Sequence, residues 1–113
     1  MFRGNWRSAS GGGGGGTSDL VWATATAGTF TFTGTTNAVK GDVSSTAITV
    51  QLPLASSFAG KIYTIKHTLG PILTNPITIT SSGGSIDGLA TIVVSQTKST
   101  TRICSDGTDW QII

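Results

Sequence analysis

The sequence has no glutamate, one histidine and one cysteine, and its purely hydrophobic runs are only a few residues long. A single cysteine, Cys104, cannot close an intrachain disulfide, which excludes the disulfide-stapled class of small secreted domains. The hydrophobic runs fall far short of the roughly 18 residues that a membrane span requires. No apolar stretch of signal-peptide length lies near the N-terminus. These absences predict a soluble chain made in the cytoplasm, without a targeting device.

Hydroxyl side chains and glycine take the place of charge. Charged residues form 11% of the 113 residues, whereas the sequence contains 20 threonines, 13 serines and 16 glycines. Serine, threonine and glycine are poor helix formers, and β-branched residues favour strands. The composition therefore predicts an all-β chain, and its length fits one modest domain.

The net charge of +2 comes from seven basic and five acidic residues scattered along the chain. Nucleic-acid-binding proteins usually show a clustered basic patch. Since the basic residues form no run of like charge, the charge pattern argues against a nucleic-acid partner.

The chain divides into an N-terminal arm, residues 1–18, and a β-domain, residues 19–113. The centre of the arm is the run Gly11–Gly16, whose composition is that of a flexible linker. Before it, two aromatic residues alternate with two arginines. This segment is either a plain tail or an anchoring peptide, because tryptophan and arginine are favoured residues of interface hot spots. The four candidate anchor residues are Phe2, Arg3, Trp6 and Arg7.

Strand patterns follow one another closely from Leu20 onward. Apolar and polar residues alternate with the period of two that is typical of half-buried strands. Leu20–Thr26 and Thr29–Thr33 flank Ala27-Gly28 as a hairpin, Pro53 is expected to end the strand that begins near Ile48, and Leu54–Ala59 is expected to form a single helical turn. Further strands are expected over 61–67, 77–80, 90–94, 101–104 and 110–113. Short strands with frequent turns predict a small antiparallel β-sandwich or barrel-like domain.

The sequence offers no catalytic constellation. A Cys104–His67 dyad is conceivable, but Cys104 lies in an apolar strand pattern, where cysteines are usually inert packing residues. Asp87 and Asp106 each precede a glycine, in turn positions where aspartate bonds its own backbone. We therefore expect no enzyme activity, no metal site and no bound cofactor.

The aromatic residues of the β-domain are expected mainly in the core rather than on a sugar-stacking platform. A barrel that binds single-stranded nucleic acid would need exposed aromatics beside basic residues. Tyr63 with Lys61 and Lys66 is the local candidate for such a surface.

Five segments occur in an order that resembles the compact β-domain of phage virion fibres, tail fibres and head spikes. They are an apolar strand ending in Leu-Pro, a Gly-x-x-Tyr-x-Ile-Lys strand, an Ile-Thr-Ile strand, an Ile-Asp-Gly turn and a closing Ser-Asp-Gly-Thr-x-Trp hairpin. In this sequence they are 47–53, 60–66, 76–80, 84–88 and 105–113. The resemblance covers residues 37–113, about two-thirds of the chain.

This resemblance implies a homotrimer that is a structural component of a virion and docks on other virion proteins through its N-terminal arm. Trimerisation also suits a small sheet protein, because exposed strand edges invite aggregation and 113 residues supply a thin core. The positions expected in the core or a trimer interface are Ile48, Val50, Leu52, Tyr63, Ile65, Ile77, Ile79, Ile92, Val94, Ile103, Trp110 and Ile112.

The alternatives to a purely structural role are a lectin-like module that binds host surface glycans and an oligonucleotide-binding barrel. A lectin needs an exposed aromatic residue and a polar cluster. An oligonucleotide barrel would show strongly salt-dependent DNA affinity.

Overall fold

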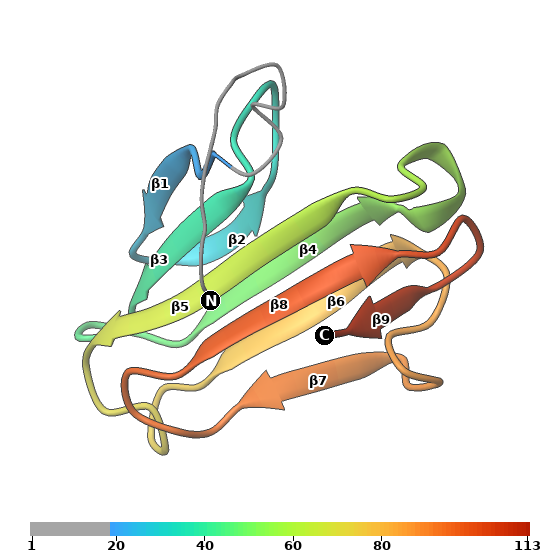
Figure 1. Ribbon diagram of the computed structural model, residues 1–113. Helices are drawn as coiled ribbons and strands as arrows, with labels where there is room; N and C mark the ends of the chain where they lie inside the picture. Colours follow the sequence, from blue (N-terminus) through green and yellow to red (C-terminus); the bar gives the residue numbers. More distant parts are fainter. Residues whose placement is uncertain (1–18) are drawn as a thin grey trace, which may run out of the picture.

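The computed structural model describes residues 19–113, which form nine strands and one short 3-10 helix (Figure 1). The elements are β1 (Trp22–Ala25), β2 (Gly28–Thr31), β3 (Ala38–Asp42), β4 (Ile48–Leu54), η1 (Ala55–Ser57), β5 (Ile62–Leu69), β6 (Ile77–Gly83), β7 (Thr91–Val94), β8 (Thr100–Ser105) and β9 (Trp110–Ile112). The predicted all-β class is therefore confirmed. No helix in the described part of the chain is long and apolar enough to cross a membrane.

The strands form two sheets that face each other as a sandwich (Figure 1). Sheet A has the order β1-β3-β5-β8-β9, and sheet B has the order β2-β4-β6-β7. The first six strands enter the two sheets alternately, so that neighbours within each sheet run parallel. Only the pairs β5–β8, β6–β7 and β8–β9 are antiparallel among the described strands. The prediction of an antiparallel fold is wrong, because the chain coils between the sheets instead of folding back within one.

The same coiling corrects the hairpin predicted around Ala27-Gly28. β1 pairs with β3 in sheet A, whereas β2 pairs with β4 in sheet B. The two-residue link between β1 and β2 therefore carries the chain from one sheet to the other. A strand's period of two reports which faces are buried, but it does not identify the neighbouring strand.

Two local predictions have different outcomes around Pro53. β4 continues through Pro53 to Leu54, because the ladder with β6 pairs Leu52 with Ser81 and Leu54 with Gly83 and passes over the proline. β2 pairs with β4 only as far as Gln51. The missing N–H of proline therefore removes no bond from the β2–β4 or the β4–β6 ladder, and the prediction that Pro53 ends the strand is wrong. The expected helical turn is confirmed as η1.

The core lies between the sheets, and most of the predicted core positions are in it. Ten of them are buried within the single chain: Ile48, Val50, Leu52, Tyr63, Ile65, Ile77, Ile79, Val94, Ile103 and Trp110. Ile92 is half-buried against them, and Ile112 is 41% exposed. Phe30, Phe32, Tyr63 and Trp110 form a continuous row of ring contacts through this core, with centroid separations of 4.3–5.7 Å.

Candidate functional site

Charge is divided between the two sheets. In the described part of the chain, no strand of sheet B contains a charged residue. On sheet A, Lys40 is paired with Lys66, and Arg102 is paired with Thr64. Lys40 is exposed between buried Val39 and Gly41, and Arg102 is exposed beside buried Ile103. The outer face of sheet A is therefore the polar, basic face of the sandwich.

The outer face of sheet B carries short, uncharged side chains in two rows. The pairing of the strands puts Thr29, Thr49, Thr78 and Val93 in one row and Thr31, Gln51, Thr80 and Thr91 in the next. Threonine and valine are stiff at χ1, and the Gln51 amide is held along the face because it donates to the Ser82 hydroxyl at 3.0 Å. This face, called the threonine face below, presents hydroxyl and methyl groups at fixed positions.

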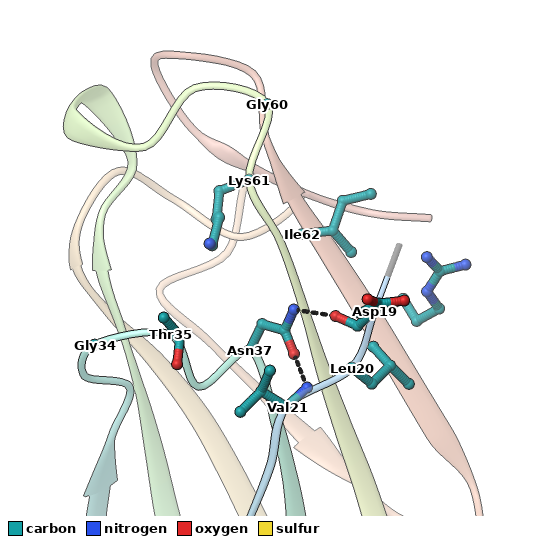
Figure 2. A pocket seen from close by; sticks show the side chains of 10 residues that line it. Asp19, Leu20, Val21, Gly34, Thr35, Asn37, Gly60, Lys61 and Ile62 are labelled. Carbon is teal, nitrogen blue, oxygen red and sulfur yellow. Dashed lines mark hydrogen bonds between the residues drawn. The ribbon is translucent and has the colours of Figure 1, made fainter. Parts of the chain in front are cut away.

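A hollow of about 740 Å³ lies at the end of the sandwich where β5 begins (Figure 2). Asn37 fixes one wall, because its Oδ1 accepts from the Val21 N–H at 2.7 Å and its Nδ2 donates to the Asp19 carbonyl at 2.8 Å. Lys61 and Thr35 lie on one side of Asn37 and Asp19 on the other, as Figure 2 shows. Lys61, Arg102 and Asp19 give the hollow groups of both charges. Such a lining suits a small polar ligand.

His67 and Cys104 do not form a dyad. Cys104 is paired with Ile62, at the start of β5. His67 lies near the end of β5, where its N–H donates to the Ser99 carbonyl. Five residues of extended strand separate the two positions by about 17 Å. His67 is 1% exposed.

Both ring nitrogens of His67 are used in structural bonds. Its Nδ1 accepts from the Lys98 N–H and its Nε2 lies 2.9 Å from the Gly70 carbonyl. Because Nδ1 is an acceptor, the proton is assigned to Nε2, which donates to Gly70. The ring therefore ties the β5–β6 loop to the β7–β8 loop.

Tyr63 does not provide the exposed stacking surface considered above, since it is 4% exposed and lies between Phe32 and Trp110. Burial raises the pKa of its hydroxyl above the usual 10.0. Trp22 is the more accessible ring, at 40% exposure, with the Lys40 ammonium 6.0 Å from its centroid.

The aspartates act as turn and edge supports. Asp106 Oδ1 accepts from the N–H groups of Thr108 and Asp109, both at 2.8 Å, as predicted for an Asp-Gly turn. Asp87 Oδ1 accepts from the Ile112 N–H across to β9. Within residues 19–113, no group of three or more histidine, cysteine or acidic side chains is placed to hold a metal ion.

The turn bonds of Asp106 lead to a pH prediction. Hydrogen bonds from Asp109, Thr108 and Gln111 lower the pKa of this carboxyl below its ordinary 3.8. A carboxyl with a lowered folded pKa stabilises the fold above its unfolded pKa, and this contribution is lost as the pH falls through the folded value. When the pH is lowered from 7 to below about 4, we expect the unfolding free energy of Asp106→Asn to fall by less than that of the parent chain. Urea denaturation at pH 7, 4 and 3 measures this, and parallel losses in both proteins contradict it.

The predicted anchor residues Phe2, Arg3, Trp6 and Arg7 lie outside the described residues. The threonine face and the hollow were missed by the sequence analysis, since each collects residues from separate strands and loops. Alternating threonines at 29–31 and 78–80 were the available signal for the face. Comparison of the sequence with models of known protein families and with curated proteins finds no match.

Proposed function

We propose that this chain is a non-enzymatic structural component of a phage virion, such as a head fibre, a spike or a short tail fibre. It acts as a homotrimer and docks on other virion proteins through residues 1–18. Support comes from the five ordered segments that resemble phage fibre domains and from the all-β fold. Host attachment is a further role of such a component.

The observation that carries the proposal is an apolar seam left open at the β7 edge of sheet B. Val93, in β7, is 56% exposed, and Leu89, just before this strand, is 57% exposed. Each square ångström of such surface removed from water contributes about 25 cal/mol. Association with further copies would cover this seam.

Light scattering of the purified full chain at micromolar concentration tests the trimer. We expect three times the protomer mass of 11.5 kDa. A monomer at that concentration contradicts the trimer. Mass spectrometry of purified particles tests the virion assignment, which is wrong if the chain is missing from them.

A lectin-like role is the second candidate, and the hollow beside Asn37 favours it. Lys61, Arg102 and Asp19 offer the charged hydrogen-bonding groups that orient a polar ligand such as a sugar. A glycan array tests this role. Binding that is lost in Lys61→Ala and Arg102→Ala but kept in Lys40→Ala supports it, and a blank array with the parent chain contradicts it.

A further inference from the structure

The two edges of sheet B differ from the last edge of sheet A. β2 and β7 are the outermost strands of sheet B, each has four residues, and neither contains a charge or a proline. Charge, proline and coverage by a loop are the usual ways in which proteins prevent an edge strand from pairing with another chain. β2 and β7 themselves are therefore not protected by a charged residue or by a proline.

The edge of sheet A at β9 is covered by the loop between β6 and β7. The Trp110 N–H donates to the Ser85 carbonyl, the Trp110 carbonyl accepts from the Asp87 N–H, and the Ile112 N–H donates to Asp87 Oδ1, at 2.8–3.0 Å. β9 therefore has the β6–β7 loop on one side and β8 on the other. Pairing between copies through the β9 edge is therefore blocked.

We propose that three copies join through sheet B, with β2 of one copy pairing to β7 of the next, so that the three sheets close into a triangular tube lined by their threonine faces. The inference rests on the proposed trimer. A head-to-tail contact that repeats three times closes a ring and leaves sheet B without a free edge.

Strand direction suits this closure. β2, β4 and β6 run parallel to one another, and β7 runs antiparallel to β6. If the three-fold axis follows the strands, β7 of one copy is antiparallel to β2 of its neighbour. Antiparallel pairing is slightly the more stable arrangement per residue.

The dimensions also agree with the side chains. Four strands spaced about 4.8 Å apart give a side of about 19 Å, and each side of such a triangle lies about 5.5 Å from the axis, close to half the roughly 10 Å between packed sheets. Only short, uncharged side chains fill this space well. Six of the eight positions in the two rows are threonine, one is Val93, and the remaining Gln51 lies along the face in its bond to Ser82.

The orientation places the charges on the outside. Sheet A lies behind sheet B, so its outer face with Lys40, Lys66 and Arg102 would cover the surface of the trimer. Burying a charged face along the axis would carry a large desolvation penalty. The division of charge between the two sheets is thus explained by a trimer with sheet B inside.

Disulfide formation between copies tests the pairing. Continuing the rows around the ring sets Val93 of one copy opposite Thr29 of the next. Within one chain the two positions are three strand spacings apart, about 14 Å, which is too far for a disulfide. The Thr29→Cys, Val93→Cys variant, with Cys104→Ser to remove the native thiol, is expected to give covalent dimers and trimers on mild oxidation.

The matched control is Thr24→Cys, Thr100→Cys in the same Cys104→Ser background. These exposed positions lie in one row of sheet A, also three spacings apart. We expect this pair to remain monomeric on a non-reducing gel. Equal crosslinking of both pairs overturns the proposal.

A second variant does not depend on disulfide geometry. Thr78 is at the centre of the threonine face, and Thr78→Lys is expected to reduce the light-scattering mass three-fold, whereas Thr100→Lys on sheet A leaves it unchanged. A trimer that survives Thr78→Lys and gives no Thr29–Val93 crosslink overturns the tube and leaves the proposed trimer standing. A parent chain that is monomeric contradicts the proposed function itself.

Discussion

Replacing Trp110 with alanine is expected to lower the free energy of unfolding by about 3–5 kcal/mol, the usual range for removing a large aromatic residue from a core. Trp110 is fully buried and has the greatest volume of the fully buried side chains in the described chain. Its ring centroid lies 5.7 Å from that of Tyr63, and its indole N–H donates to the Pro53 carbonyl at 3.1 Å. The side chain therefore joins β9 to the end of β4 and to the aromatic row.

Urea denaturation at one fixed protomer concentration measures this loss, because association makes apparent stability concentration-dependent. Many small domains have only about 5–15 kcal/mol in total, so Trp110→Phe is a necessary companion. It keeps most of the volume but leaves the Pro53 carbonyl without its donor, and we expect a loss of about 1–3 kcal/mol.

The control for Trp110 is Trp22→Ala, since Trp22 is 40% exposed. Substitution of an exposed ring beside a lysine is expected to change the unfolding free energy by about 1 kcal/mol or less. Equal losses in Trp22→Ala and Trp110→Ala would show that Trp110 does not have the core role described above.

Gly70→Ala is expected to be the second most damaging change, with a loss of about 2–5 kcal/mol from left-handed strain and overpacking together. Gly70 has a φ of +96°, and a Cβ there would overlap the backbone of Val43 and Ser44. Its carbonyl also accepts the bond from His67 Nε2. The β5–β6 loop can approach the end of β3 only because this residue lacks a side chain.

Gly60→Ala separates the two causes of that loss. Gly60 has a φ of +81°, but a Cβ there meets nothing within 4 Å. It therefore tests left-handed strain alone, for which we expect about 1–2 kcal/mol. Thermal or urea denaturation of both variants gives the difference, and no difference between them contradicts the assigned backbone overlap.

The individual strands were predictable where alternation was strong. β4, β5 and β6 carry apolar residues at alternate positions, and the structure buries seven of these: Ile48, Val50, Leu52, Tyr63, Ile65, Ile77 and Ile79. β3 was missed because its sequence, Ala-Val-Lys-Gly-Asp, has few strand-forming residues. Its Gly41 is explained by packing, since a Cβ there would come within 2.5 Å of the Ile77 Cδ1 atom.

The assignment of strands to sheets was not predictable from periodicity. Alternation shows that Thr49 and Thr78 face away from the core, but it does not show that they are neighbours in one sheet. The same limit hid the division of charge between the sheets and the residues around the hollow. Each arises from pairing between strands that are distant in the sequence.

The coiled order of the strands has a consequence for how the chain folds. Partners such as Ile48 and Ile77 meet only after the chain has passed through the opposite sheet. Loop closure must therefore precede most of the pairing, which makes folding slow for a chain of this size. The β6–β7 and β8–β9 hairpins are the pairs of consecutive strands that can form locally. The two C-terminal hairpins are therefore the places where strand pairing can begin without first closing a loop through the opposite sheet.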